Sequence, residues 1–177
     1  QQVHDLLIRA SANDKVFGRT WEQLYARPGA PPSAAPRWWE QKRTALLELG
    51  KRHGAAFVYD ASTIDARIAE LRQLKSADRV LYSIKANPNA EVLRRIAAGG
   101  LAFECVSQGE LEHVLQLFPT SDPASILFTP NFAPRAEYER AFALGVRVTL
   151  DNLHPLREWP QLFKGREVFV RVDTGHG

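Results

Sequence analysis

The chain has 177 residues, 45% of them hydrophobic, which is enough for the core of one ordinary domain or of part of a larger one. A single cysteine, Cys105, excludes an intrachain disulfide and a zinc site built from cysteines. The net charge of +3 is small and scattered, which disfavours nucleic-acid binding, and no apolar run has the length of a membrane span. Because the polar residues 1–5 do not resemble a signal peptide, we expect a cytoplasmic protein that does not bind membranes.

Residues 1–36 are expected to hold the end of a preceding domain followed by a linker. The apolar cluster at residues 6–8 suggests a helix end without a nearby partner, and residues 26–36 have the proline-rich composition of an extended linker. We therefore assign residues 37–177 to a second domain. Its first helix is expected to open at Trp38 and Trp39 and to stop at Gly54. Two adjacent tryptophans after a linker are more typical of a docking anchor than of a ligand platform.

From residue 57 onwards, short apolar strands alternate with amphipathic helices. We expect strands at residues 57–59, 80–86, 101–106, 126–128, 146–150 and 168–172, and helices at 62–75, 90–98, 107–118, after Pro134 and at 156–162. This alternation predicts an α/β fold with a parallel sheet. No glycine-rich dinucleotide loop follows the first strand, so a (β/α)8 TIM barrel is favoured over a doubly wound sheet. The prediction is a partial barrel of about six strands with an N-terminal helical extension.

Lys85 stands out at the end of the second expected strand. Asn87 is a suitable N-cap and Pro88 a suitable first residue for the next helix, so Lys85 is expected at the C-terminal edge of the sheet, where barrels carry their chemistry. Partial desolvation between Ile84 and Ala86 would lower the pKa of its amine and allow it to form a Schiff base with a carbonyl group. The alternative is a strand-end lysine that extends into water.

The other strand ends add polar groups to the same edge. Glu104 lies in an otherwise apolar strand, where a carboxylate needs a partner, and Arg171 is a candidate for that partner. Ser107 and Glu110 are explained as a capping box, while Asp60, Asp151 and Asn152 suit ordinary caps. The histidines are dispersed along the chain, so we expect no metal site.

Several motifs resemble the barrel-type pyridoxal-phosphate decarboxylases, which have an alanine racemase-like fold. Residues 82–88 (Tyr-Ser-Ile-Lys-Ala-Asn-Pro) resemble the cofactor-lysine motif of that family. Residues 103–111 (Phe-Glu-Cys-Val-Ser-Gln-Gly-Glu-Leu) resemble its next strand and helix start, and residues 128–131 and 150–152 also fit. The resemblance runs from about residue 57 to the C-terminus.

Within this family the pattern is most similar to the diaminopimelate decarboxylases, with ornithine- or arginine-type decarboxylases as the nearer alternative. Alanine racemases usually continue the lysine motif with Tyr-Gly-His-Gly, whereas residues 88–90 here are Pro-Asn-Ala. The resemblance therefore implies a lyase of lysine biosynthesis that converts meso-2,6-diaminopimelate to L-lysine and carbon dioxide.

The resemblance also implies roles for individual residues. Lys85 would be the catalytic residue and would form the Schiff base with pyridoxal 5'-phosphate, which takes up the electrons released as carbon dioxide leaves an amino-acid substrate. Glu104, Ser107 and Arg171 would join Lys85 as cofactor-binding residues. The phosphate-binding glycine loop, the acid facing the ring nitrogen and a C-terminal β domain would lie beyond Gly177. We therefore expect residues 1–177 alone to be an inactive, truncated part of an enzyme that forms a homodimer.

Three further interpretations remain open. Residues 3–7 (Val-His-Asp-Leu-Leu) resemble the last helix of an aspartokinase regulatory domain, as in bifunctional aspartokinase/diaminopimelate decarboxylases. A non-catalytic pyridoxal-phosphate-binding barrel is a second reading of the same motifs, disfavoured by the linker and the tryptophan-containing extension. A structural barrel without a cofactor is disfavoured by Glu104 and Arg171, which have no obvious structural purpose.

Overall fold

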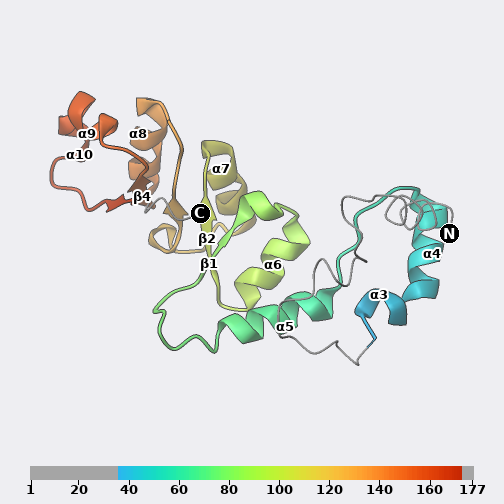
Figure 1. The fold of residues 1–177 in the computed structure, drawn as a ribbon. Helices are drawn as coiled ribbons and strands as arrows, with labels where there is room; N and C mark the ends of the chain where they lie inside the picture. Colours follow the sequence, from blue (N-terminus) through green and yellow to red (C-terminus); the bar gives the residue numbers. More distant parts are fainter. Residues whose placement is uncertain (1–35, 173–177) are drawn as a thin grey trace, which may run out of the picture. The chain divides into compact units, whose positions relative to one another are not determined.

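The structure is a computed structural model that describes residues 36–172. The chain consists of two compact units, and the boundary between them falls between Phe57 and Val58. In the first unit, α3 (Trp38–Gln41) and α4 (Arg43–His53) form the expected helical segment (Figure 1). Apart from Pro36, the linker predicted at residues 26–36 lies outside the described residues, and so do residues 3–7 and 173–177. The domain boundary at that linker therefore stays a prediction.

The first turn of α3 is aromatic. The rings of Trp38 and Trp39 meet edge to face with their centroids 5.8 Å apart, and the Arg37 guanidinium lies 5.3 Å from the Trp39 ring. The Glu40 carboxylate accepts a hydrogen bond of 2.8 Å from the Arg37 N–H, which caps the turn. After α4, Gly54 has a φ of 69°, a conformation that favours glycine and ends the helix where the sequence predicts.

The second unit contains a five-stranded parallel sheet whose strands stand side by side in chain order. The strands are β1 (Leu81–Ser83), β2 (Ala102–Cys105), β3 (Leu127–Phe128), β4 (Arg147–Leu150) and β5 (Phe169–Val170). Its helices are α5 (Ala61–Leu71), α6 (Ala90–Ala98), α7 (Gln108–Leu117), α8 (Arg135–Leu144), α9 (His154–Glu158) and α10 (Pro160–Phe163), with two short 3-10 helices, η1 (Ile84–Ala86) and η2 (Pro123–Ser125). This repeated strand–helix order confirms the predicted α/β fold and partial barrel (Figure 1).

Residues 57–59 do not form the first predicted strand. Phe57 is 93% exposed, Tyr59 is also exposed, and no strand pairing in the described part of the chain includes them. A strand is stabilised by pairing with its neighbours, and this tripeptide lies at the division between the two units without such a neighbour. The expected six strands are therefore five within residues 36–172.

Helix α5 starts from Asp60, one of the residues that the sequence suggests as caps. The Asp60 side chain is buried, and its carboxylate accepts hydrogen bonds from the Thr63 N–H (2.8 Å) and from the hydroxyl groups of Ser62 and Thr63. A carboxylate can accept several donors at once, which a serine hydroxyl cannot match. The helix therefore begins at Ala61 and ends at Leu71, four residues before the predicted end.

Helices α5 and α6 pack closely against each other at Gly99. A Cβ atom added to Gly99 would lie 2.3 Å from Cγ2 of Ile68, which is buried on α5. An ion pair of 2.9 Å between Asp65 and Arg95 also joins the two helices. The absence of a side chain at Gly99 thus sets the separation of α5 and α6.

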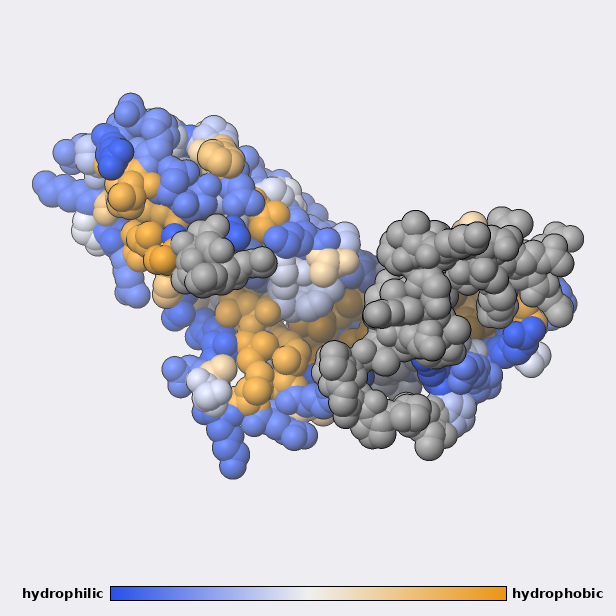
Figure 2. Space-filling view, in the orientation of Figure 1, coloured by the Kyte–Doolittle hydropathy of each residue, from blue (hydrophilic) through white to orange (hydrophobic). Residues whose placement is uncertain are grey.

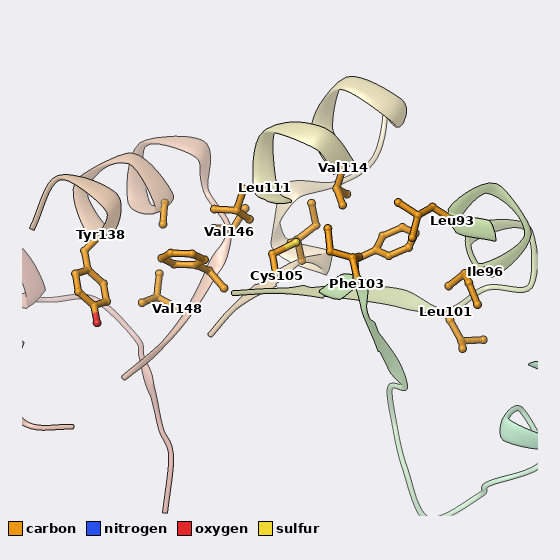
Figure 3. Close-up of a cluster of buried hydrophobic side chains, with 14 of the residues drawn as sticks. Leu93, Ile96, Leu101, Phe103, Cys105, Leu111, Val114, Tyr138, Val146 and Val148 are labelled. Atoms are coloured by element: carbon orange, nitrogen blue, oxygen red, sulfur yellow. The ribbon is translucent and has the colours of Figure 1, made fainter. Parts of the chain in front are cut away.

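The core lies between the sheet and the helices α6, α7 and α8, as Figure 3 shows. Phe103 and Cys105 of β2 point toward helical residues such as Leu111 and Val114, and the Phe103 ring stacks on Phe118 with 5.3 Å between centroids. The opposite face of the sheet does not take part in this packing. That face carries the polar side chains of the candidate site.

The surface view in Figure 2 is mainly hydrophilic, with apolar areas between the charged side chains. The large apolar side chains that are exposed include Leu74, Phe132 and Val170. Within residues 36–172, no helix is both long enough and apolar enough to span a membrane.

Candidate functional site

The strand register places Ser83, Glu104 and Leu127 in one row across the sheet, because Ser83 pairs with Glu104 and Glu104 with Leu127. The neighbouring Phe103 and Cys105 point into the helix-covered core. Since successive side chains of a strand point to opposite faces, the row lies on the other face of the sheet. In a barrel that face is the interior, and the C-terminal strand ends form the mouth of the active site.

Lys85 follows β1 at this edge but lies in η1, and not in the strand predicted for residues 80–86. Ile84 is fully buried, whereas Lys85 is exposed. The predicted desolvation of its amine is therefore wrong, because the short 3-10 helix turns Ile84 into the core and leaves Lys85 on the solvent side. Among residues 36–172, no hydrogen bond or ion pair engages the Lys85 ammonium group.

The loop after Lys85 is held by two asparagine side chains. The Asn87 carboxamide oxygen accepts a hydrogen bond from the Asn89 N–H (3.0 Å), and that of Asn89 accepts one from the Glu91 N–H (2.9 Å). The N-cap of α6 is thus Asn89, and not the predicted Asn87, while the helix itself covers residues 90–98 as the sequence predicts. Pro88 accordingly precedes the cap instead of opening the helix.

Two longer-range bonds fix the same loop. Nε2 of His113, on α7, lies 2.9 Å from the Pro88 carbonyl oxygen, and because a carbonyl oxygen only accepts, this nitrogen carries the hydrogen. The Tyr82 hydroxyl donates to the Asn87 carbonyl oxygen at 3.5 Å. Burial, with a smaller effect of Tyr59, raises the pKa of Tyr82, so this hydroxyl stays protonated. A role for His113 is not predicted from the sequence, because its contact with Pro88 joins residues 25 positions apart.

Glu104 lies on the inner face of β2 and is half-buried. Within the described residues its carboxylate has no hydrogen bond or ion pair. The suggested pairing with Arg171 does not occur in this part of the chain. Arg171 follows β5, three strands from β2, and parallel strands are spaced about 4.8 Å apart.

Arg171 instead contacts the loop after β3. Its Nη1 lies 3.4 Å from Oδ1 of Asn131, and its backbone N–H donates to the Leu150 carbonyl oxygen (2.8 Å). Asp151, which the sequence suggested as an ordinary cap, accepts a hydrogen bond from the Phe132 N–H (3.2 Å). Phe132 has a φ of 52° and is 89% exposed. The loops after β3, β4 and β5 are thereby joined at one edge of the sheet.

Ser107 is the N-cap of α7, and its hydroxyl accepts a hydrogen bond of 3.3 Å from the Glu110 N–H. The Glu110 carboxylate accepts one from the Val106 N–H (2.6 Å), one residue before the position that a standard capping box uses. Capping therefore accounts for the acceptor role of Ser107. Its own hydroxyl hydrogen remains available for a ligand.

Three hydroxyl oxygens near this edge are buried and have no hydrogen-bond partner within the described residues. They belong to Ser83, Thr129 and Thr149. None of the three residues is predicted as a site residue from the sequence. The available signal was a hydroxyl residue inside an apolar strand, as in Val146–Leu150, where alternation places Thr149 opposite Val148 and Leu150.

Two further titratable groups lie on the core side of the sheet. Burial, with smaller effects of Glu110 and Glu104, raises the pKa of the Cys105 thiol to about 12. Burial likewise raises the pKa of Tyr138 to about 12, with the nearby Asp151 as the second cause. Neither group is ionised near neutral pH. In residues 36–172, no cluster of three or more His, Cys, Asp or Glu side chains has the arrangement of a metal site.

Residues 61–177 match the family described as pyridoxal-dependent decarboxylase, pyridoxal binding domain. The chain is 36% identical over 132 residues to a diaminopimelate decarboxylase of Deinococcus radiodurans. The aligned residues cover 74% of this chain and 34% of the relative. It is 32% identical over 94 residues to an ornithine decarboxylase of Neurospora crassa, with 52% of this chain and 19% of the relative covered.

A crystal structure of lysine decarboxylase from Selenomonas ruminantium superimposes on this chain with a TM-score of 0.64 and 24% identity, covering 76% of this chain and 36% of that one. This likeness concerns the fold. The chain spans about a third of the length of the first curated relatives it matches.

Proposed function

Because this chain belongs to the pyridoxal-dependent decarboxylase family, we propose that it forms the part of an amino-acid decarboxylase that binds pyridoxal 5'-phosphate through Lys85. The observation that carries the proposal is the position of Lys85, in the matched segment and at the C-terminal edge of a parallel sheet. The proposed substrate is meso-2,6-diaminopimelate, converted to L-lysine and carbon dioxide in lysine biosynthesis. The similarity to the Deinococcus radiodurans enzyme supports this choice.

The residues at this edge fit the proposed cofactor. The amine of Lys85 is exposed and available to the aldehyde group, Glu104 offers a carboxylate without a partner in the described chain, and three buried hydroxyls offer donors. When bound, pyridoxal phosphate supplies the electron-accepting ring that decarboxylation of an amino acid needs.

Each proposed site residue contributes through its own chemistry. Lys85 binds the cofactor and exchanges protons through its amine. Glu104 adds a negative charge on the inner face beside Ser83, two residues before Lys85. Arg171, oriented by Asn131, adds a positive charge that suits an anionic group of the cofactor or the substrate. Ser107 can donate its hydroxyl hydrogen while it caps α7.

An ornithine- or arginine-type decarboxylase is the second candidate, supported by the match to the Neurospora crassa enzyme. The two candidates share Lys85 and the cofactor and differ in the substrate side chain. Turnover of meso-2,6-diaminopimelate, ornithine and arginine by the full-length protein separates them. Formation of lysine supports the first candidate, and formation of putrescine or agmatine in its place supports the second.

Properties of the whole protein are also proposals, since the chain covers about a third of its relatives. We propose a cytoplasmic homodimer in which residues 37–177 begin the barrel and residues 1–36 hold the end of a preceding aspartokinase domain and a proline-rich linker. A non-catalytic pyridoxal-phosphate-binding protein is the alternative. That alternative predicts cofactor binding without carbon dioxide release from any of the three amino acids.

The role of Lys85 is tested by borohydride reduction of the full-length protein with pyridoxal phosphate, followed by mapping of the labelled peptide. We expect the label on Lys85, its loss in Lys85→Ala and its persistence in Lys75→Ala, a control that removes another exposed lysine. Label on a different lysine contradicts the proposal. In the same assay, Glu104→Gln should weaken cofactor retention, whereas Glu112→Gln, on α7, should not.

A further inference from the structure

The hydroxyl groups of Ser83, Thr129 and Thr149 are unusual because each oxygen is buried and none has a partner within residues 36–172. Buried polar groups in folded proteins are almost always hydrogen-bonded, and an unpaired one costs about 1–3 kcal/mol. Thr149 is the most enclosed of the three residues, with 7% of its surface exposed. Three buried hydroxyls without partners should therefore destabilise the fold, unless a partner outside the described residues binds them.

The three hydroxyls lie on the same face of the sheet. Ser83 is in the row of Glu104, and the pairing of Phe128 with Val148 puts Thr129 beside Thr149, one strand apart. Val148 and Leu150, on either side of Thr149, are buried in the helix-covered core. By alternation, Thr149 faces the barrel interior. A fourth unpartnered hydroxyl, that of Tyr138, belongs to the core side and is a separate case.

Packing alone does not require hydroxyls at these positions. Inner positions of parallel strands are normally filled by valine, isoleucine or leucine, and valine has nearly the shape of threonine without the polar atom. A sequence selected only for stability would place valine at residues 129 and 149. The hydroxyls therefore point to a partner that is not part of the described chain.

We infer that Thr149, together with Thr129 and Ser83, hydrogen-bonds polar atoms of the pyridoxal phosphate held at Lys85. This inference rests on the proposed function and adds binding residues to it. Thr129 and Thr149 lie one row beyond the Ser83–Glu104 row, toward the C-terminal edge where Lys85 follows β1. Each hydroxyl can donate one hydrogen bond and accept two, which suits the oxygen atoms of the cofactor.

The test is Thr149→Val in the full-length protein, in which stability without cofactor should be kept while affinity for the cofactor is reduced. Without cofactor, the melting temperature should stay equal or rise, since a buried unpaired hydroxyl is removed. The dissociation constant for pyridoxal phosphate, measured by absorbance titration, should increase about fivefold to tenfold. Thr149→Ser, which keeps the hydroxyl, should restore most of the affinity. Thr129→Val should behave like Thr149→Val, with an equal or higher melting temperature without cofactor and a larger dissociation constant for pyridoxal phosphate.

Thr63→Val is the matched control, because the Thr63 hydroxyl donates to Asp60 at the start of α5 (2.8 Å). This variant should lower the melting temperature and leave the dissociation constant unchanged. An unchanged dissociation constant in Thr149→Val, or a lower melting temperature without cofactor, overturns the inference while the role of Lys85 stands. If Lys85→Ala binds as much pyridoxal phosphate as the unchanged protein, the cofactor is not held by Lys85. That result overturns the proposed function itself and the inference with it.

Discussion

Cys105 illustrates how two faces of one strand give neighbouring residues opposite properties. Its side chain is fully buried among core residues, while the adjacent Glu104 faces the open side of the sheet. Burial raises the pKa of the thiol from 9.0 to about 12, so the thiol is neutral wherever the protein is folded near neutral pH. Although Cys105 lies within the family motif, it is not a nucleophile of the candidate site.

This shift predicts a loss of stability at alkaline pH. In the unfolded chain the thiol ionises near pH 9, whereas in the folded chain it stays protonated until about pH 12, so the free energy of unfolding should fall as pH rises between these values. The fall should be shallower in Cys105→Ala, in which the effect of Tyr138 is retained. Denaturant titrations between pH 8 and pH 11 measure both slopes. Equal slopes in the two proteins would show that the thiol titrates alike in the folded and unfolded states.

Helix faces and caps were the easier part of the fold to predict. Val92, Leu93 and Ile96 are buried on α6, and Ser107 caps α7, both as the sequence indicates, because periodicity and capping are local. The lysine loop was harder, since a 3-10 turn in place of the strand end moved the N-cap to Asn89. The prediction of a strand at residues 57–59 was wrong, because strand pairing depends on a neighbour that the local sequence cannot specify.

For the candidate site, the sequence identified the edge but not its contacts. Lys85, Glu104 and Arg171 all lie at or near the C-terminal strand ends, as predicted from their position in the pattern. The absence of a Glu104–Arg171 pair within the described residues depends on strand order, and the bond from His113 to Pro88 depends on how α7 packs. Both are tertiary properties that no short motif encodes.

The contact between α5 and α6 leads to a prediction for Gly99→Ala. Gly99 has an ordinary φ of −75°, so alanine is not excluded by the backbone, but its Cβ would lie 2.3 Å from Cγ2 of Ile68. Relief requires movement of α5, and we expect destabilisation of about 1–3 kcal/mol. Gly109→Ala, on α7 with no atom within 4 Å of the added Cβ, should be neutral or stabilising.

Thermal denaturation of the two variants measures the difference. If the close approach is the cause, Ile68→Ala should reduce the additional cost of Gly99→Ala, because it removes the atom that clashes. Additive effects in the double variant would mean that alanine at position 99 acts through something other than Ile68.

The sheet formed by the described residues has two open edges. In the described chain β1 pairs only with β2, and β5 only with β4. A closed barrel has no such edges, and strand edges without partners favour association with other chains. The match to about a third of each curated relative agrees with a sheet that is one part of a barrel wall.

We therefore expect that residues 1–177 alone do not release carbon dioxide from meso-2,6-diaminopimelate, even with pyridoxal phosphate added. Barrels of this type commonly bind phosphate with loops after the last two strands, and the described sheet ends at β5. The measurement is lysine formation by the purified 177-residue chain, with its Lys85→Ala variant as the control. Lysine formed by the chain and abolished in the variant would refute the expectation.

The order of the strands bears on how the molecule is made. Because β1 to β5 follow one another in space as they do along the chain, each strand from β2 to β5 pairs with a strand that has already been synthesised when it leaves the ribosome. The described sheet can therefore form by the addition of one strand at a time, in chain order. Lys85 is laid down with the first strand of this series and Arg171 after the last. The proposed site residues of this segment are therefore all present only after Arg171 has been translated. A ribosome that stalls between residues 85 and 171 would carry a chain with the lysine but without the arginine.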